Sequence, residues 1–339
     1  MKILVTGAAG FIGHAIIKRL VSEQHDVVGI DNINTYYDTG IKFARLADLG
    51  IEREDVSGSS PVLSRSYTGL HFLRLDITDC EGMASLFDKE HFDCVINLAG
   101  QPGVRYSIEN PYAYVQSNVV GFLNLLENCR HHPIRHFLYA SSSSIYGDST
   151  NVPFSETMPT DKPVSLYAAT KKSDELMAYA YSRLYKIPAT GLRFFTVYGP
   201  WGRPDMAPFL FMKSIIEGKK IRVFNNGHLS RDFTYIDDIV DGMMSVLTHP
   251  SDDAVPHRVY NIGHSSPVQL LDFISAIEKV TGRKAVEEMT DMQPGDVHCT
   301  YADTTRISRD FGYRPSVGID EGMKKFYEWY KVFSRSEKA

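Results

Sequence analysis

Two patterns of apolar residues alternate along the first 200 residues of the chain. Short runs rich in valine, isoleucine and leucine occupy residues 2–6, 26–30, 70–75, 94–98, 136–140 and 189–194. Stretches with the spacing of an amphipathic helix lie between most of them, at residues 11–22, 80–91, 112–131 and 165–185. Nearly continuous apolar strands that alternate with helices predict a buried parallel sheet with helices on both faces.

The alternation loosens after residue 200. Helices are expected at residues 208–217, 236–247, 267–281 and 318–330, with short strands at 222–224 and 258–262. Residues 50–69 carry serine, glycine and proline with little periodicity, and they are expected to form a long loop after the second helix. The sequence therefore predicts an α/β protein with a large, doubly wound parallel sheet and a smaller, mixed α/β C-terminal lobe.

The composition excludes several other classes of protein. Hydrophobic residues make up 43% of the chain and charged residues 23%, as in an ordinary globular protein with a sizeable core. The net charge of −5 lacks the basic excess of a general nucleic-acid binder. No apolar run reaches the roughly 20 residues of a transmembrane helix, and no signal peptide precedes the first strand. We therefore expect a cytoplasmic protein that binds neither nucleic acid nor membrane.

The four cysteines are spread along the chain, at Cys80, Cys94, Cys129 and Cys299. They form neither a C-x-x-C pair nor the spacing of a zinc site, so no metal is expected. Isolated thiols of this kind are typical of a reducing compartment.

A glycine-rich turn joins the first expected strand to the first expected helix. Its glycines, Gly7, Gly10 and Gly13, have the spacing G-x-x-G-x-x-G. Glycine lets the backbone turn tightly and approach a pyrophosphate, and the helix N-terminus offers N–H groups to that anion. Asp31 ends the next strand, where a carboxylate accepts hydrogen bonds from an adenosine ribose and repels a 2′-phosphate. The motif predicts a dinucleotide site that favours NAD over NADP.

Tyr167 and Lys171 form a Y-x-x-x-K motif near the start of an expected helix. The spacing places both side chains on one helix face. A tyrosine hydroxyl ionises near pH ~10, but an adjacent ammonium and the cationic nicotinamide ring both favour the phenolate. Tyr167 is therefore a candidate base for a sugar hydroxyl. The serines at 141–144 follow the fifth strand, at the sheet edge where ligands bind in this architecture.

These motifs make the chain resemble the extended short-chain dehydrogenase/reductase family and, within it, the nucleotide-sugar 4-epimerases. The resemblance covers essentially the whole chain and also includes Asp76-Ile77, Asn97-Leu98-Ala99-Gly100 and Arg231-Asp232-Phe233. It implies a Rossmann-like domain with one tightly held NAD over residues 1–195. It further implies a C-terminal lobe over residues 196–339 that binds a UDP-sugar, with the chain free to cross between the two.

The resemblance also assigns roles to individual residues. Ser142 and Tyr167 would hydrogen-bond the reacting 4-hydroxyl, while Lys171 would anchor the nicotinamide ribose and favour ionisation of Tyr167. The residues expected at NAD, in addition to Tyr167 and Lys171, are Gly7, Gly10, Phe11, Ile12, Gly13, Asp31, Asn32, Asp76, Ile77, Leu98, Ala99 and Gly100. The residues expected at the substrate are Arg105, Asn118, Ser143, Ser144, Thr196, Arg203, Phe224, Arg231, Gln293 and Asp296.

The segment after Ser142 favours epimerisation over dehydration. Related dehydratases and decarboxylases place an acidic residue there, and a dehydratase needs that acid to help move a proton and expel water. This chain has Ser143 and Ser144 instead. Epimerisation needs only that a hydride leave C4 of the sugar and return to its opposite face.

The stretch at 193–206 resembles the corresponding stretch of UDP-glucuronate 4-epimerases, whereas UDP-galactose epimerases carry asparagine at the position of Thr196. A buried C6 carboxylate must be paired or multiply hydrogen-bonded, and Arg203, Thr196 and the two serines are candidates for this. The alternative for Arg203 is an ordinary surface arginine in a Gly/Pro loop.

Other residues of the C-terminal lobe suit the UDP group. Arg231 matches a family arginine that binds pyrophosphate. Gln293 stands where UDP-galactose epimerases have an arginine, which puts a second arginine clamp in doubt, although glutamine still donates hydrogen bonds. Phe224 is expected either beside uracil or as a plain core residue.

Three functions remain open on the sequence. The chain is a 4-epimerase of a UDP-hexuronic acid, a 4-epimerase of UDP-galactose or a UDP-N-acetylhexosamine, or a non-catalytic NAD-binding sensor of the same fold. Retention of Ser142, Tyr167 and Lys171 together argues against the sensor. The resemblance also predicts a homodimer, formed through the helices at 112–131 and 165–185.

Overall fold

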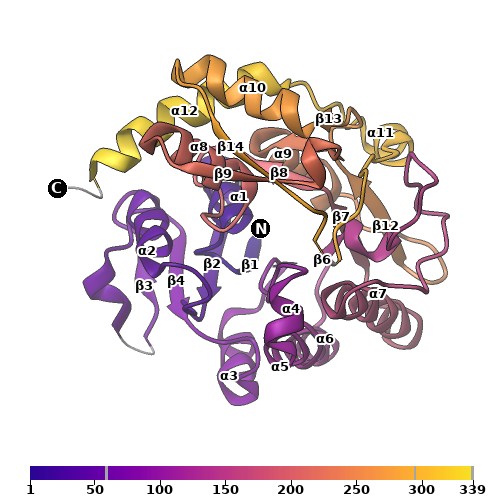
Figure 1. The fold of residues 1–339 in the computed structure, drawn as a ribbon. Helices are drawn as coiled ribbons and strands as arrows, with labels where there is room; N and C mark the ends of the chain where they lie inside the picture. Colours follow the sequence, from indigo (N-terminus) through magenta and orange to yellow (C-terminus); the bar gives the residue numbers. More distant parts are fainter. Residues whose placement is uncertain (58–59, 294, 337–339) are drawn as a thin grey trace. The chain divides into compact units, whose positions relative to one another are not determined.

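The computed structural model describes residues 1–57, 60–293 and 295–336 (Figure 1). The chain divides into two compact units, each of which is discontinuous in sequence. The first unit comprises Met1–Gly147, Pro159–Arg193 and Met243–Tyr260. The second comprises Asp148–Met158, Phe194–Gly242 and Asn261–Ala339.

The main sheet has eight strands in the order β12-β7-β6-β5-β1-β2-β4-β3. Its strands are β1 (Lys2–Thr6), β2 (Asp26–Asp31), β3 (Val62–Leu63), β4 (Leu70–Arg74), β5 (Cys94–Asn97), β6 (His136–Ser142), β7 (Ala189–Phe194) and β12 (His257–Ile262). The pairs β1/β2, β1/β5, β2/β4 and β5/β6 are parallel, and the short β3 pairs antiparallel with β4 at the edge. All six strands expected in the first part of the sequence are present.

The order of the strands reverses between β1 and β5. The chain builds outward from β1 to β2 and β4 on one side, and from β5 to β6 on the other. Ligands bind at such a reversal, outside the carboxyl ends of the strands. Thr6 and Asn97 end β1 and β5 opposite each other, and the Thr6 hydroxyl donates to the Asn97 amide oxygen at 2.6 Å. The same Thr6 oxygen accepts a hydrogen bond from the Ala99 N–H at 3.0 Å, which fixes the turn after β5.

Helices cover both faces of this sheet. They include α1 (Phe11–Ser22), α2 (Thr39–Asp48), α3 (Cys80–Glu90), α6 (Gly121–His131) and α7 (Leu166–Tyr185). A Cβ added to Gly29 of β2 would lie 3.3 Å from Ile17 of α1, so α1 packs on that face. The adjacent Val28 belongs to a core cluster with Phe87 of α3 and Phe122 of α6, on the other face. The predicted doubly wound α/β sheet is confirmed.

The helix expected at 112–131 is confirmed as a stretch that is helical without a break from Pro111 to His131, but a π-helical segment lies inside it. The structure has α4 (Tyr106–Glu109), α5 (Pro111–Tyr114), a π-helical turn η2 (Val115–Val120) and then α6. Asn118 lies in the π turn with its side-chain amide fully engaged by Gln101 and Thr170. A π turn is rare and clusters at functional sites. The hydrophobic spacing alone does not reveal it.

The expected loop at 50–69 also contains structure. Its described residues include the 3-10 helix η1 (Arg53–Ser57) and the edge strand β3. Such short elements are too brief to produce a periodic pattern.

The second unit is a mixed α/β lobe. Its elements are β8 (Thr196–Tyr198), α8 (Ala207–Glu217), β9 (Lys220–Phe224), η4 (Asn225–Gly227), β10 (Ser230–Arg231), β11 (Phe233–Tyr235), the first part of α9 (Ile236–Leu247), β13 (Val268–Gln269), α10 (Leu270–Thr281), β14 (Val286–Thr290), α11 (Thr305–Phe311) and α12 (Ile319–Ser336). Three two-stranded sheets pair β8 with β11, β9 with β14 and β10 with β13. The four helices expected from the sequence are present, but most of these short strands were not expected. No helix in the described ranges has the length and apolar character needed to cross a bilayer.

Candidate active site

The glycine-rich turn after β1 is closely packed against the backbone after β5. Gly7 has φ +71°, and a Cβ there would lie 2.9 Å from the backbone of Leu98 and Ala99. A Cβ on Gly13 would lie 2.1 Å from the Gly7 carbonyl oxygen. Only glycine fits these positions, so the turn leaves an open backbone cradle at the start of α1. Phe11 and Ile12 form the first turn of α1, with the Phe11 side chain buried.

Asp31 ends β2 beside this cradle. Its Oδ2 accepts the Ala9 N–H at 3.2 Å, and its Oδ1 accepts the Ile33 N–H at 2.8 Å. The Lys42 Nζ of α2 lies 3.6 Å from Oδ1, and the side chain of Lys42 is buried. Nothing in the sequence pattern singles out Lys42, because a lysine within an amphipathic helix is usually exposed.

A second group of predicted cofactor residues gathers next to Asp31. Asn32 donates its side-chain amide to Asp76 at 2.7 Å, and Asp76 also accepts from the N–H and hydroxyl of Thr78. Burial pushes the pKa of Asp76 upward, but these hydrogen bonds outweigh it and hold the pKa below its usual value. Ile77 is buried beneath Gly121, the first residue of α6, where a Cβ would lie 2.6 Å from the Ile77 side chain.

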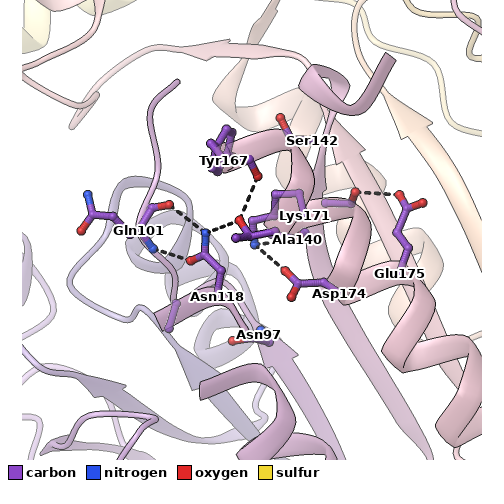
Figure 2. Close-up of polar contacts among 12 residues, drawn as sticks. Asn97, Gln101, Asn118, Ala140, Ser142, Tyr167, Lys171, Asp174 and Glu175 are labelled. Atoms are coloured by element: carbon purple, nitrogen blue, oxygen red, sulfur yellow. Dashed lines mark hydrogen bonds and ion pairs between the residues drawn. The ribbon is translucent and has the colours of Figure 1, made fainter. Parts of the chain in front are cut away.

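The predicted catalytic residues come from β6 and α7, as Figure 2 shows. Ser142 ends β6, and Tyr167 and Lys171 lie in the first turns of α7. The Ser165 hydroxyl accepts the Ala168 N–H and starts α7 at this point. The Ser142 hydroxyl oxygen accepts hydrogen bonds from the Ser144 N–H at 3.2 Å and the Ser144 hydroxyl at 2.9 Å. The proton of Ser142 is thereby left to donate to another acceptor.

The Lys171 ammonium is buried and donates to two acceptors. Its Nζ lies 3.1 Å from the Ala140 carbonyl oxygen and 3.1 Å from Oδ2 of Asp174 (Figure 2). Burial pushes the pKa of Lys171 downward, but the charge of Asp174 and then that of Tyr167 outweigh it and raise the pKa. A Cβ on Gly100, at φ +158°, would lie 3.5 Å from this Nζ, so Gly100 keeps the space beside the ammonium open.

Asn118 ties the loop after β5 to α7. Its Oδ1 accepts the Gln101 N–H at 2.7 Å, and its Nδ2 donates to the Gln101 carbonyl at 3.1 Å (Figure 2). The same Nδ2 donates to the Thr170 hydroxyl at 3.0 Å. Arg105 follows this loop at the start of α4 and is exposed. Gln101 was missed by the sequence analysis, because its backbone, and not its side chain, makes these contacts.

A buried ion pair supports the end of β6. Glu175 accepts from Nε and Nη2 of Arg193, each at 2.8 Å, and from the Ser141 hydroxyl at 2.7 Å. Arg193 also donates to the Tyr146 hydroxyl at 2.8 Å. Burial raises the pKa of Glu175, but the Arg193 hydrogen bonds outweigh it and hold the pKa below its usual value. This network connects α7, β7, β6 and the 3-10 helix η3 (Ser143–Tyr146).

The remaining predicted substrate residues belong to the second unit. Thr196 starts β8, which pairs with β11, and its N–H donates to the Asp232 carbonyl at 3.1 Å. Arg231 precedes Asp232 in β10 and donates to the Ser230 carbonyl at 2.9 Å. Thr196 therefore lies opposite β11, the strand that follows Arg231 and Asp232 in the chain.

Arg203 is already engaged in an ion pair within its own loop. Its Nε lies 3.1 Å from Oδ1 of Asp205, and its Nη2 contacts the other carboxylate oxygen. Phe224 ends β9 opposite Thr290 of β14. The Asp296 N–H donates to the Gln293 carbonyl at 3.1 Å. Each of these three segments is local, and the contacts above do not join Arg203, Phe224 and Gln293 into one cluster.

Comparisons with known proteins agree with this geometry. The sequence model of the NAD dependent epimerase/dehydratase family matches residues 3–263. A probable UDP-glucuronate 4-epimerase of Rhizobium meliloti (strain 1021) is 43% identical over 97% of this chain and 97% of its own length. UDP-glucuronate 4-epimerase 2 of Arabidopsis thaliana is 44% identical over 97% of this chain and 76% of its own length.

A solved structure gives the same relationship in three dimensions. The UDP-glucuronic acid 4-epimerase of Bacillus cereus, in complex with UDP-glucuronic acid and NAD, superposes with a TM-score of 0.87 at 33% identity. The match covers 98% of this chain and 100% of that chain. The chain described here belongs to the NAD dependent epimerase/dehydratase family.

Proposed function

We propose that this chain is an NAD-dependent UDP-sugar 4-epimerase and that it converts UDP-glucuronate to UDP-galacturonate. The observation that carries the proposal is the placement of Ser142, Tyr167 and Lys171 at the carboxyl edge of a doubly wound sheet whose glycine cradle fits a dinucleotide. The similarity to UDP-glucuronate 4-epimerases over nearly the whole chain supports the choice of sugar.

The first unit holds the NAD in this proposal. The cradle of Gly7, Gly10 and Gly13 receives the pyrophosphate, because a Cβ at any of them would lie within 2.9 Å of backbone. Asp31 faces the adenosine ribose, and Asp76 and Ile77 lie beside adenine. When bound, NAD supplies a reversible hydride acceptor for C4 of the sugar. The third N–H of the Lys171 ammonium remains for the nicotinamide ribose, since Ala140 and Asp174 take two.

The proton of the sugar 4-hydroxyl is moved by the residues at the carboxyl edge of the main sheet, Ser142, Tyr167 and Lys171. Tyr167 removes it from the sugar 4-hydroxyl, and Ser142 donates a hydrogen bond to the same oxygen as the carbonyl develops. The buried Lys171 ammonium favours the ionised form of Tyr167. After the 4-keto sugar presents its opposite face, Tyr167 returns the proton to the oxygen. The two residues directly after Ser142 are Ser143 and Ser144 and not an acid, so the 4-keto sugar is not dehydrated.

The second unit recognises the UDP-sugar in this proposal. Arg231 binds the pyrophosphate, and Phe224 stacks beside uracil. Gln293 and Asp296 complete the nucleotide side, and Asn118 supports the loop against the substrate. The C6 carboxylate is held by Thr196, Ser143, Ser144 and Arg203.

We also propose that the protein is a cytoplasmic homodimer. Apolar side chains stand exposed on the segments 112–123 and 176–185 of the first unit. They include Tyr112 with 81% of its surface exposed, Leu184 with 68% and Leu176 with 60%. Exposed apolar residues that gather on two helical segments are typical of an interface.

The test is incubation of the purified protein with UDP-glucuronate without added reductant, followed by identification of the product. The proposal expects UDP-galacturonate, with no net change in NADH absorbance and with a C4 deuterium label retained. UDP-galactose and UDP-N-acetylglucosamine are assayed in parallel. Faster turnover of either would reassign the sugar, and NAD binding without turnover of any UDP-sugar would favour the sensor.

A further inference from the structure

Asp174 is a buried carboxylate that the proposed mechanism does not use. It lies on α7 one turn beyond Lys171 and is 0% exposed. Its Oδ2 accepts from the Lys171 ammonium at 3.1 Å (Figure 2). Its Oδ1 is buried and has no hydrogen-bond partner among the described residues. A buried carboxylate with an unpartnered oxygen is unfavourable, so its presence here calls for a role.

The adjacent Glu175 shows the difference between two buried acids. Both oxygens of Glu175 are used, by Arg193 on one side and by Arg193 with Ser141 on the other. Glu175 thereby joins β6, β7 and α7. Asp174 has Lys171 as its ion-pair partner, and that lysine belongs to the predicted catalytic set. Asp174 therefore acts on the site through Lys171.

We propose that Asp174 is a positioning residue that fixes the Lys171 ammonium beside the Ala140 carbonyl and keeps it protonated at alkaline pH. The proposal rests on the proposed function, in which Lys171 must be an ammonium to hold the nicotinamide ribose and favour ionisation of Tyr167. A buried lysine without an anionic partner loses its proton several pH units earlier than an exposed one. Asp174 is the carboxylate that prevents this.

The pKa of Asp174 determines the pH range in which its negative charge acts on Lys171. Burial raises the pKa of Asp174 to about 7, against the opposing charge of Lys171. The carboxyl is therefore neutral in acid and becomes an anion above neutrality. Removing an anion lowers the pKa of a neighbouring ammonium, so loss of Asp174 affects Lys171 on the alkaline side and leaves the acid side unchanged.

Few other ionisable groups face Asp174. Tyr139 of β6 is buried, and burial and then the charges of Glu175 and Asp174 raise its pKa, so it stays neutral. The π turn η2 carries no ionisable side chain. The ionisable residues of the other elements that pack on α7 are Tyr106 and Glu109 of α4, Tyr112 and Tyr114 of α5, Glu127, Cys129, Arg130 and His131 of α6, His136 of β6 and Tyr146 of η3. The α6 groups contact the far end of α7, where Glu127 accepts from Tyr181 and Arg130 stacks on Tyr185.

The test compares wild type with Asp174→Asn, which keeps the shape and an acceptor oxygen but removes the charge. Turnover of UDP-glucuronate and the Kd of NAD are measured from about pH 6 to about pH 10. We expect the two proteins to agree near pH 6. Above neutrality, the alkaline limb of the kcat profile of Asp174→Asn moves down by about one pH unit or more, and its NAD affinity weakens over the same range.

Glu175→Gln is the matched control, because it removes a buried carboxylate one residue away that is paired with Arg193. It is expected to lower Tm without moving the alkaline limb. If Asp174→Asn lowered kcat by the same factor at every pH, or shifted neither profile, Asp174 would be structural and the proposal would be overturned. Asp174→Ser gives the same comparison if Asp174→Asn melts below the assay temperature.

The NAD arm separates this proposal from the proposed function. A wild-type protein that turns over no UDP-sugar, but whose NAD affinity depends on Asp174 above neutrality, would contradict the epimerase and keep the pairing role. Epimerisation by wild type, with superimposable kcat and NAD profiles for the two proteins, would keep the epimerase and contradict the pairing role.

Discussion

Two arginines ten residues apart show how differently two parts of the molecule are built. One part is the scaffold behind Ser142 at the end of β6, and the other is the loop that follows β8. Arg193 of the first unit is 4% exposed and joins Glu175 and Tyr146, which come from distant parts of the sequence. Arg203 of the second unit is 20% exposed and pairs with Asp205, two residues along the same loop. The first arginine holds a fixed scaffold. The second is in a partly hydrated pair within one loop, which under the proposed function would have to yield to the sugar carboxylate.

The largest expected effect comes from Tyr167, the proposed base near the start of α7. Tyr167→Phe should leave NAD binding and Tm near the wild-type values but reduce kcat about 10²–10⁴-fold, because it removes the hydroxyl that takes the proton. The measurement is turnover of UDP-glucuronate by the folded variant. Turnover within about threefold of wild type would exclude Tyr167 as the base.

The next effect tests the scaffold itself. Arg193→Met should lower the free energy of unfolding by about 3–5 kcal/mol, because it removes the two hydrogen bonds of the guanidinium from the buried Glu175 carboxylate. Arg203→Ala should lower it by less, about 1 kcal/mol, since water reaches this pair and screens it. Both values follow from urea unfolding of the two variants. Similar losses of free energy of unfolding in the two variants would show that the difference in burial between Arg193 and Arg203 does not affect stability.

The sequence and the structure agree best where a pattern is long or chemically restricted. The helix at 11–22 and the strand at 189–194 coincide with α1 and β7, because each is a full-length element with an uninterrupted apolar pattern. The glycine-rich turn after β1 could be predicted because only glycine is sterically possible at its three positions.

Contacts between distant residues could not be read from the sequence. The π turn at Asn118 depends on partners at Gln101 and Thr170. The pairing of Lys171 with Asp174 is an i, i+3 contact, but nothing in the sequence shows that both side chains are buried. The Arg203–Asp205 pair could not be predicted either, because two charged residues at this spacing in a loop do not by themselves indicate a contact.

Asp31 offers a test of intermediate size at the cofactor end of the catalytic unit. Asp31→Ala should weaken NAD binding about 10–100-fold, because hydrogen bonds to a charged group are lost. The preference for NAD over NADP should also narrow, since the Asp31 carboxylate no longer repels a 2′-phosphate. Lys42, which lies 3.6 Å from Asp31 in the wild type, can then pair with that phosphate. The Kd values of both cofactors check this. An unchanged ratio of the two would remove Asp31 from the ribose site.

The smallest expected effect concerns the Arg203–Asp205 pair in the loop that follows β8. Arg203 is expected to favour a C6 carboxylate over a C6 hydroxymethyl group, because a guanidinium binds a carboxylate through two parallel hydrogen bonds. Asp205 already makes such a bidentate contact, so the sugar carboxylate has to replace it and gains only part of that energy. Arg203→Ala should therefore reduce kcat/KM for UDP-glucuronate about tenfold while changing that for UDP-galactose little.

Asp205→Asn should act in the opposite direction on the same selectivity. It removes the competing charge but retains the loop, so Arg203 becomes a stronger partner for the substrate and KM for UDP-glucuronate should fall. The two variants are compared by the ratio of kcat/KM for the two sugars. Opposite changes in that ratio would establish Arg203 as the group that reads C6, with Asp205 as its competitor. Equal losses for both sugars in Arg203→Ala would make the pair structural and assign recognition of the carboxylate to Thr196 and the serines after β6.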